Sequence, residues 1–234
     1  MDVLITGGSR GIGFGIAREL AASGHRLMLV SRNSKRIGDA SRKLDAEHPG
    51  LVFSHACDVA ESEAIEALAA HCTKLNFTPG CLVVNAGIFI EGTLSDAPER
   101  DLQETMRVDF LAAYRLVRQF LPQLKASESG RVILIGSTAA YEPYPVGALY
   151  GVAKWALRGL AVNLRRELIP ANVGVTFLAP GGTLTDLWEN EQLPPKRLLD
   201  PSDIGKLVAV CLSLSSQAVV EELIVRPMLG DIHE

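Results

Sequence analysis

The sequence predicts an α/β fold in which one doubly wound, mainly parallel sheet of seven strands carries helices on both faces. Three observations lead to this prediction. Seven short apolar runs alternate with helical segments along the chain, which is the rhythm of βαβ units. Several of these runs end in small or polar residues, and the first is followed at once by a glycine-rich turn. Such a sheet gathers the carboxyl ends of its strands at one edge, where ligands bind.

Length and composition favour a single domain. The chain has 234 residues, of which 47% are hydrophobic, so it can bury one sizeable core, and we expect one domain over residues 1–234. The formal charge of −4 gives no general attraction to nucleic acid or to anionic membranes. No apolar run approaches the roughly 20 residues needed to cross a bilayer, so we expect no membrane association.

Cysteine and histidine usage predicts a cytoplasmic protein without a metal. The four cysteines show no CxxC spacing, and the chain opens on a strand without a signal-peptide pattern. Small reduced core residues are the expected state of these cysteines. The five histidines form no ligand cluster, so we expect no metal.

The first strand, glycine turn and helix predict a dinucleotide site. Residues 2–6 form the strand, residues 7–13 the turn, and residues 14–22 an apolar-periodic helix. Glycines at 7, 11 and 13 let the main chain approach a diphosphate, which the amides at the start of the helix then hold. A plain turn is the alternative, but the position between strand and helix favours cofactor binding.

The end of the second strand, residues 26–30, predicts the choice of cofactor. An acidic residue at this point accepts from the ribose hydroxyls of NAD and repels a 2′-phosphate. Ser31 removes that repulsion, and Arg32 can donate two hydrogen bonds to a phosphate, with Arg10 as a second cation. We therefore expect NADP(H). A solvated basic loop is the competing interpretation of Arg32.

The middle of the chain repeats the pattern of strand, polar tip and helix. Asp58, after the third strand, is a candidate contact for adenine or a helix cap, and Asn85, after the fourth, is expected to fasten neighbouring strands. Pro98 suits a first helical turn, and Gly130 lies beyond the end of that helix. The predicted elements are a helix over 34–47, strands over 51–56 and 81–84, a long helix over 98–124 and a strand over 131–135.

Tyr150 and Lys154 are the residues that we expect to carry the chemistry. They are four residues apart in a predicted helix, so their side chains rise from one face and their heads can converge. A free phenol has a pKa of about 10, so a tyrosine needs a fixed positive charge to favour its phenolate, and Lys154 supplies one. Ser137 follows a buried strand, and the two hydroxyls together can hold a carbonyl oxygen and move a proton. A surface Tyr–Lys pair is the alternative.

The last third of the chain predicts a strand, a flap and the remaining elements. Proline and glycine after a strand over 173–178 are expected to break it where a nicotinamide lies. Residues 186–200 suit a mobile flap that contains Trp188, with a disordered surface loop as the alternative. A helix from 200 to about 214 and a strand over 222–225 follow. We expect pocket walls at 88–92, at 139–147 and near Trp188, where Tyr141 and Tyr144 favour an uncharged or aromatic-tolerant substrate.

Five motifs in order resemble the short-chain dehydrogenase/reductase family over essentially the whole chain. They are the turn at 6–13, Asp58, the Asn85-Ala86-Gly87 run, Ser137 with Tyr150 and Lys154, and the segment 180–185. The resemblance implies a single Rossmann-type domain, a nicotinamide cofactor and hydride transfer, with Tyr150 as acid–base residue, Lys154 on the nicotinamide ribose and Ser137 on the substrate oxygen. It implies the following cofactor-binding residues: Gly7, Ser9, Arg10, Gly11, Ile12, Gly13, Ser31, Arg32, Asp58, Val59, Asn85, Ala86, Gly87, Val108, Tyr150, Lys154, Pro180, Gly181, Thr183 and Thr185.

Two positions depart from the family pattern. Asp109 stands where the family usually has an asparagine that holds a water in the proton path, so it is a candidate relay residue or a structural acid. If its carboxylate lies near Lys154, it should favour the ammonium and partly offset the pull of Lys154 on Tyr150. The chain end, residues 222–231, lacks the glycine pair of many tetrameric acyl-carrier reductases. It is more similar to members that act on small hydroxy acids and aldehydes.

The sequence therefore predicts an NADPH-dependent carbonyl reductase that acts on a small carbonyl or alcohol substrate. A catalytically silent NADP(H)-binding regulatory protein is the alternative from another class, motivated by Asp109. An epimerase or lyase that uses the cofactor transiently is a third. The resemblance also implies a homodimer or homotetramer assembled through the helices at 98–124 and 148–168.

Overall fold

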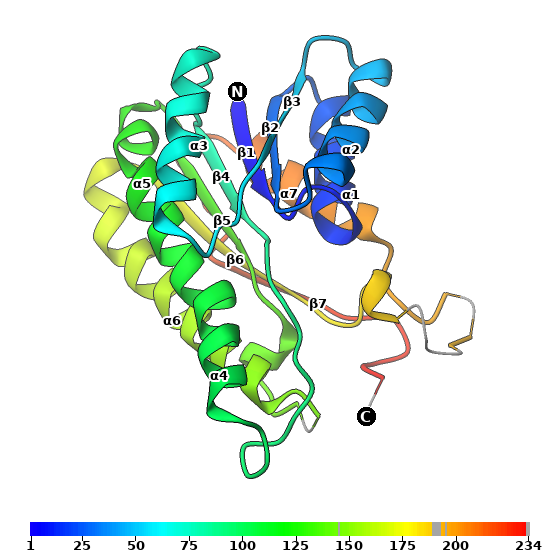
Figure 1. The fold of residues 1–234 in the computed structure, drawn as a ribbon. Coiled ribbons are helices and arrows are strands. Elements are labelled where there is room, and N and C mark those ends of the chain that lie inside the picture. Colours follow the sequence, from blue (N-terminus) through cyan, green and yellow to red (C-terminus); the bar gives the residue numbers. More distant parts are fainter. Residues whose placement is uncertain (145, 189–192, 195, 233–234) are drawn as a thin grey trace.

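Seven strands form one sheet in the computed structural model, which describes residues 1–144, 146–188, 193–194 and 196–232 (Figure 1). The strand order is β3-β2-β1-β4-β5-β6-β7, and each neighbouring pair is parallel. This confirms the predicted fold class. The strands are β1 (Asp2–Thr6), β2 (Arg26–Ser31), β3 (Val52–Ala56), β4 (Cys81–Val84), β5 (Arg131–Ile135), β6 (Gly174–Pro180) and β7 (Glu222–Val225).

Helices cover both faces of the sheet. In Figure 1, α1, α2 and α7 lie on one face, and α3, α4, α5 and α6 lie on the other. The α-helices are α1 (Gly11–Ala22), α2 (Ser34–Glu47), α3 (Ser62–Lys74), α4 (Glu99–Met106), α5 (Ala112–Ala126), α6 (Ala148–Leu168) and α7 (Pro201–Ser213). A π-helical turn, η1 (Arg107–Leu111), joins α4 to α5, and short 3₁₀ turns are η2 (Thr138–Ala140), η3 (Ile169–Ala171) and η4 (Asp186–Trp188).

The sheet separates two apolar cores. In β1, Val3 and Ile5 pack with α1 and α7, whereas Leu4 belongs to the core that contains α3, α5 and α6. Successive strand residues point to opposite faces, and both faces are covered, so the central strands are apolar throughout rather than alternating. In the part of the chain that is described, no helix is both long and apolar enough to cross a membrane.

The long helix predicted over 98–124 is interrupted. It begins at Glu99, passes through the π-helical turn η1 and continues as α5 to Ala126. A π turn inserts one extra residue into a helix and is frequent at functional sites. In this π turn the consecutive residues Val108 and Asp109 are both buried. Hydrophobic periodicity does not reveal such an insertion, which is why one continuous helix was predicted.

Several other boundaries differ from the sequence prediction, and helix α1 begins at Gly11, three residues before its predicted start at Phe14. Strand β6 continues through Pro180, two residues beyond the predicted end, and Pro180 pairs with Val225 of β7. Proline is tolerated there because β5 has already ended, at Ile135 opposite Leu178, so no ladder donor is needed on that side. Helix α3 occupies the connection between the third and fourth strands, for which the sequence analysis gave no bounds.

Candidate active site

A cavity of about 1030 Å³ lies at the carboxyl edge of the sheet. The strand order reverses between β1 and β4, and doubly wound sheets bind ligands at that switch point. All the predicted catalytic and cofactor residues line this cavity except Gly13. Residues far apart in the sequence are therefore brought to one site. In the described part of the chain, no group of three or more His, Cys, Asp or Glu side chains is arranged as a metal site.

The glycine turn joins β1 to the start of α1. Gly7 and Gly11 have φ values of +66° and +53°, a region that side chains rarely allow. The helix begins at Gly11, so its first backbone N–H groups lack acceptors within the helix, and Gly11 and Ile12 line the cavity. Gly13 instead packs behind the turn, where a Cβ would lie 2.2 Å from the carbonyl oxygen of Gly7. Its place is explained by close packing rather than by contact with the cavity.

Asn85 fastens the tip of β4 to the tip of β1, as the sequence predicted. Its side-chain amide donates to the carbonyl oxygen of Thr6 at 2.9 Å. The Thr6 hydroxyl in turn accepts from the backbone N–H groups of Asn85 and Ala86, at 3.0 and 3.1 Å. Thr6 was not among the predicted site residues, although its place at a strand tip was a usable signal. The two strands that flank the switch point are thus locked together.

The β2 end of the cavity carries cations. Ser31, Arg32 and Arg36 line it, and Arg32 is exposed. The hydroxyl oxygen of Ser31 is buried and has no hydrogen-bond partner in the described structure. A buried hydroxyl without a partner is costly unless a ligand satisfies it. A phosphate group fits this end, because it would accept from Ser31 and from the guanidinium of Arg32.

Asp58 follows β3 and also lines the cavity. Its carboxylate accepts from the backbone N–H of Ala60 at 3.0 Å, so it organises the turn before α3. Asp58 is not the cap of the following helix, because the N-cap residue of α3 is Glu61 and no side chain caps that helix. Asp58 lies on the cavity wall, and the predicted contact between Asp58 and the adenine of the cofactor stays a prediction.

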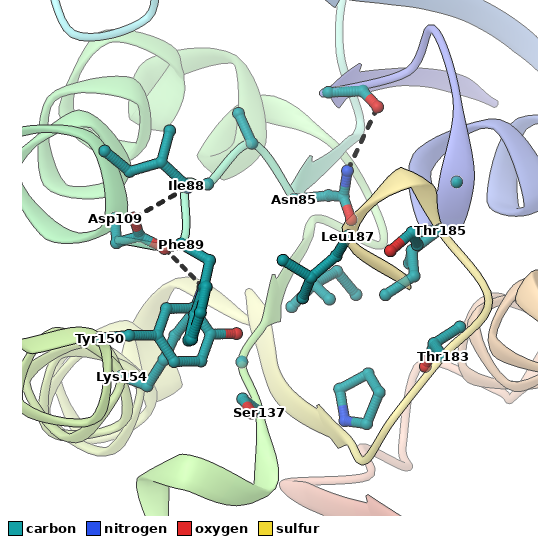
Figure 2. Close-up of a pocket in the computed structure, with 18 of the residues that line it drawn as sticks. Asn85, Ile88, Phe89, Asp109, Ser137, Tyr150, Lys154, Thr183, Thr185 and Leu187 are labelled. Atoms are coloured by element: carbon teal, nitrogen blue, oxygen red, sulfur yellow. Dashed lines mark hydrogen bonds and ion pairs between the residues drawn. The ribbon is translucent and has the colours of Figure 1, made fainter. Parts of the chain in front are cut away.

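Tyr150 and Lys154 lie one turn apart on the face of α6 that borders the cavity (Figure 2). The ammonium of Lys154 lies 5.1 Å from the centre of the Tyr150 ring. Phe89 packs edge-on against that ring, with centroids 5.5 Å apart. Ser137 follows β5, and its hydroxyl accepts from the N–H of Ala139 at 3.1 Å. The two hydroxyls and the ammonium thus line one cavity on rigid elements.

Asp109 contacts Lys154 directly. One carboxylate oxygen lies 2.9 Å from the ammonium, and the other accepts from the backbone N–H of Ile88 at 3.0 Å. The Asp109 side chain is 0% exposed and that of Lys154 is 5% exposed. Burial is the largest single influence and lowers the pKa of Lys154, but the nearby Asp109 and Tyr150 together outweigh it, so that pKa is raised above its usual value. The conditional expectation that Asp109 favours the ammonium is met by this geometry.

Gly87 leaves the room for this ion pair. A Cβ at Gly87 would lie 2.6 Å from the contacting oxygen of Asp109 and 3.4 Å from the Lys154 ammonium. The first distance is too short for any real contact, so a side chain at Gly87 would displace the carboxylate. The glycine of the Asn-Ala-Gly run is therefore explained by the close approach of the Asp109 carboxylate to the backbone of Gly87.

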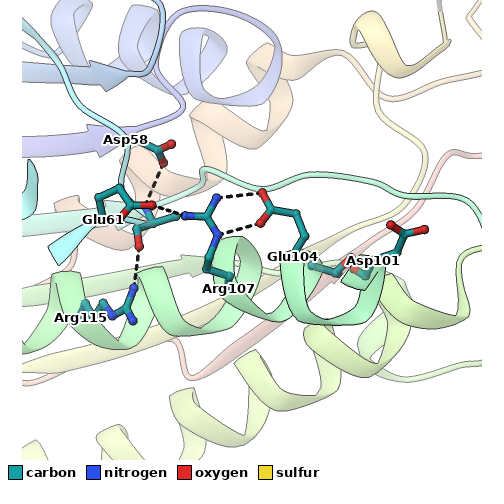
Figure 3. Close-up of polar contacts among 8 residues, drawn as sticks. Asp58, Glu61, Asp101, Glu104, Arg107 and Arg115 are labelled. Atoms are coloured by element: carbon teal, nitrogen blue, oxygen red, sulfur yellow. Dashed lines mark hydrogen bonds and ion pairs between the residues drawn. The ribbon is translucent and has the colours of Figure 1, made fainter. Parts of the chain in front are cut away.

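Polar contacts hold the π turn against the loop that follows β3 (Figure 3). Arg107 donates to both carboxylate oxygens of Glu104, at 2.7 and 2.9 Å, and to Glu61 at 2.6 Å. The hydrogen bonds from Arg107 lower the pKa of Glu104. Arg115 donates to the carbonyl oxygen of Ala60 at 2.6 Å. The turn that carries Asp109 is thus fixed from its outer side.

The segment after β6 forms part of the cavity wall. Leu184 and Leu199 are joined by a backbone hydrogen bond of 2.9 Å, which closes the base of this segment. Asp186 forms an ion pair with Arg10 of the glycine turn, and Leu187 lines the cavity (Figure 2). The predicted flap over 186–200 includes residues 189–192 and 195, which lie outside the described part of the chain.

A sequence model of the short chain dehydrogenases matches residues 2–195. The chain belongs to the short-chain dehydrogenase/reductase family. Dehydrogenase/reductase SDR family member 4 from Bos taurus is 33% identical over 95% of this chain and 84% of that protein.

Two solved structures with the same fold are complexes with NADP-type cofactors. An alcohol dehydrogenase from Thermococcus sibiricus, complexed with 5-hydroxy-NADP, has a TM-score of 0.90 and 31% identity and covers 97% of this chain and 96% of its own. An L-sorbose reductase from Gluconobacter frateurii, complexed with NADPH and L-sorbose, has a TM-score of 0.89 and 26% identity and covers 100% and 97%. The chain therefore shares both its sequence family and its fold with these oxidoreductases.

Some of the residues that line the cavity were not predicted. Asp231 and Ile232, beyond the last strand, line the cavity because a seventh parallel strand ends at the same edge as the others. The predicted parallel sheet could therefore have indicated that the residues after the seventh strand lie at the cavity. Tyr141, expected in the wall, is not among the lining residues, and its hydroxyl donates to Glu222 at the start of β7 at 2.9 Å. Only the three-dimensional packing of the loop after β5 separates it from Tyr144, which does line the cavity.

Proposed function

We propose that this chain is an NADPH-dependent reductase that interconverts a small carbonyl compound and its alcohol by hydride transfer. The observation that carries the proposal is that Ser137, Tyr150 and Lys154 line the same cavity as the glycine turn and the cationic tip of β2. A reacting group and a dinucleotide site in one cavity are what hydride transfer requires.

The glycine turn and the start of α1 would hold the diphosphate of the cofactor. Ser31 and Arg32 would hold the 2′-phosphate, which supports NADP over NAD. The two fold relatives complexed with 5-hydroxy-NADP and with NADPH point the same way. When bound, the cofactor supplies a hydride to the carbonyl carbon.

The acid–base step belongs to the side chains of α6 and β5. Ser137 and Tyr150 hold the carbonyl oxygen, and Tyr150 gives its proton to that oxygen as negative charge develops there. The Lys154 ammonium stabilises the phenolate that remains. Solvent then returns a proton to Tyr150, so each carbonyl reduced consumes one hydride and one proton.

The walls near Tyr150 favour an uncharged substrate. Phe89, Tyr144 and Trp188 give this part of the cavity an aromatic lining. Among the described lining residues, the arginines belong to the glycine turn or the β2 end, and Lys154 is paired with Asp109. A carboxylate on the substrate would therefore meet no available cation beside Tyr150.

Steady-state oxidation of NADPH with a panel of aldehydes, keto esters and diketones tests the proposal. Tyr150→Phe removes the proton donor and should lower kcat/KM by at least about 100-fold, while calorimetry should find NADPH affinity little changed. An unchanged kcat/KM in Tyr150→Phe would show that Tyr150 is not the proton donor. Tight NADPH binding by the wild type without turnover of any carbonyl would instead support the silent regulatory protein, and product formed without net NADPH consumption would support an epimerase or lyase.

We also propose a cytoplasmic homodimer or homotetramer. The described cysteines are all buried and unpaired, as expected of a reducing compartment. Tyr114 on α5 and Val152, Trp155 and Val162 on α6 are large apolar or aromatic side chains that the single chain leaves exposed. Sedimentation velocity measures the assembly, and a monomer at micromolar concentration would count against this interface.

A further inference from the structure

The segment after β7, residues 226–232, folds back against the wall of the cavity. Asp231 and Ile232 of this segment line the cavity, and the proposed reaction gives neither of them a role. A Cβ at Gly181, just after β6, would overlap a carboxylate oxygen of Asp231, and a Cβ at Gly182 would lie 3.3 Å from the Ile232 side chain. The segment is therefore packed directly on the backbone that follows β6.

One arginine joins this segment to the loop after β5, residues 138–144. Arg226 donates to the Glu142 carboxylate of that loop at 2.6 Å and also pairs with the carboxylate of Asp231. The Arg226 side chain is 26% exposed and that of Asp231 is 21% exposed, so water screens their pair only in part. A guanidinium presents a rigid fork of donors, so one side chain can hold two carboxylates at a fixed separation.

A second arginine holds the main chain of the segment after β7. Arg197 donates to the backbone carbonyl oxygens of Gly230 and Asp231, both at 2.8 Å. The main chain of Asp231 is thus held by Arg197 and its side chain by Arg226. These contacts keep the following residue, Ile232, in the cavity wall.

Both of the joined segments border the part of the cavity that contains the reacting phenol. Residues 142–144 line the cavity from the loop after β5, and residues 231–232 line it from the segment after β7. Phe89 packs edge-on against both Tyr144 and Tyr150, with ring centroids 5.9 and 5.5 Å apart. The loop after β5 therefore adjoins Tyr150 through one shared aromatic contact.

Arg226 is not among the residues that line the cavity, so it can affect a substrate only through the residues that it holds. We propose that Arg226 is a positioning residue that fixes the loop after β5 and the segment after β7 against each other and thereby raises the affinity for the carbonyl substrate. A wall that is ordered before the substrate arrives removes the entropic cost of ordering it during binding. The inference rests on the proposed function and deepens it by assigning part of the substrate affinity to a residue outside the cavity.

Hydrogen exchange in the cofactor-free protein tests whether one side chain holds both segments. Arg226→Met removes the guanidinium and keeps an apolar stem, and it should speed backbone amide exchange in residues 138–144 and 226–232 by about tenfold. Arg165→Met is the matched control, because the Arg165 side chain is also 26% exposed and pairs with Glu221 outside the cavity. The control should leave exchange in both segments unchanged. Faster exchange in only one of the two segments, or in neither, would overturn the inference.

Steady-state kinetics distinguish positioning from general support of the fold. With the carbonyl compound that the wild type reduces best, Arg226→Met should raise KM about tenfold and leave kcat within about twofold, because it removes binding shared by the ground state and the transition state. Partial unfolding would instead lower kcat at constant KM, since it only removes active molecules. The NADPH dissociation constant, measured by calorimetry, should not change. An unchanged KM, with or without a fall in kcat, would overturn the inference.

Two further variants keep the test decisive if Arg226→Met does not fold. Glu142→Gln alters a partner whose side chain is 56% exposed, and it should speed exchange of the Gly230 amide, which donates to Pro227 at 2.9 Å in the other segment. Arg226→Lys keeps the charge but not the fork of donors, so it should raise KM about threefold. No change in either variant would overturn the inference.

The two proposals fail in different ways. A wild type that reduces no carbonyl defeats the proposed function but leaves the exchange of both segments measurable. A wild type that reduces carbonyls while the Arg226 variants leave both KM and exchange unchanged defeats only the role of Arg226.

Discussion

The two ends of the cavity hold their charges in opposite ways. At the Tyr150 end, Lys154 and Asp109 are 5% and 0% exposed and contact each other inside the protein. At the other end, formed by the glycine turn and the tip of β2, Arg32 is exposed and Arg10, whose side chain is 54% exposed, pairs with Asp186. One end is a fixed and internally compensated charge pair, and the other is a set of solvated cations.

Burial decides what each charge is worth. Two unit charges 4 Å apart interact by about 4 kcal/mol at an effective dielectric constant of 20, but by about 1 kcal/mol in bulk water. A change at the buried end should therefore affect folding and chemistry together. A change at the exposed end should affect only the affinity for an anionic ligand, and salt should weaken that effect.

The largest effect is expected from Gly87→Ala at the buried end. The new methyl group would fall 2.6 Å from the Asp109 carboxylate oxygen, so the ion pair must move or the loop after β4 must shift. Overpacking of this kind costs about 1–3 kcal/mol. We expect the free energy of unfolding in urea to fall by that amount and kcat/KM to fall with it.

The control for this prediction is Gly38→Ala in α2. There a Cβ meets only the far end of the Arg42 side chain, at 3.4 Å, so the substitution should raise stability by roughly 0.5–1 kcal/mol through helix propensity. If Gly87→Ala also stabilised the protein, the Asp109–Lys154 pair would not be tightly packed, and the contrast between a buried end and an exposed end of the cavity would be wrong.

The sequence predicted the scaffold well because short apolar runs and their polar tips are local signals. Strands β1, β4, β5 and β7 lie at the predicted residues, and a glycine turn joins β1 to α1, although α1 begins at Gly11 and not at the predicted Phe14. The predicted site residues also gather at one cavity, because parallel strands must end at a common edge.

The parts that the sequence did not predict depend on packing between distant segments. The π turn in which Val108 and Asp109 are both buried does not show in the hydrophobic periodicity of the sequence. The sequence analysis said what Asp109 would do if it lay near Lys154, but it could not predict the contact itself. The distance between two helices depends on how they pack, which neither helix sequence determines alone. Gly13 resembles the neighbouring glycines in sequence, yet it packs against Gly7 and not against the cavity.

An intermediate effect is expected from Arg32→Ala at the exposed end. Loss of two charge-assisted hydrogen bonds to a 2′-phosphate should weaken NADPH binding about 10- to 30-fold and leave NADH binding and stability unchanged. Calorimetry at two salt concentrations measures this, and the loss should shrink as salt rises. Lys35→Ala, which removes a nearby exposed cation that does not line the cavity, should change little. Equal losses for NADPH and NADH would mean that Arg32 is merely solvated.

The smallest effect is expected from Asp186→Asn, and it has the opposite sign. Arg10 and Asp186 are both substantially exposed, so their ion pair contributes less than about 1 kcal/mol to stability. Removing the carboxylate frees Arg10 to approach the phosphates of the cofactor, so NADPH should bind about two- to threefold more tightly by calorimetry. Asp203→Asn, which removes another exposed acid paired with Lys206 outside the cavity, should leave binding unchanged. Weaker binding in Asp186→Asn would instead mean that this pair holds the segment after β6 over the cofactor, and that the exposed end is organised before the ligand arrives.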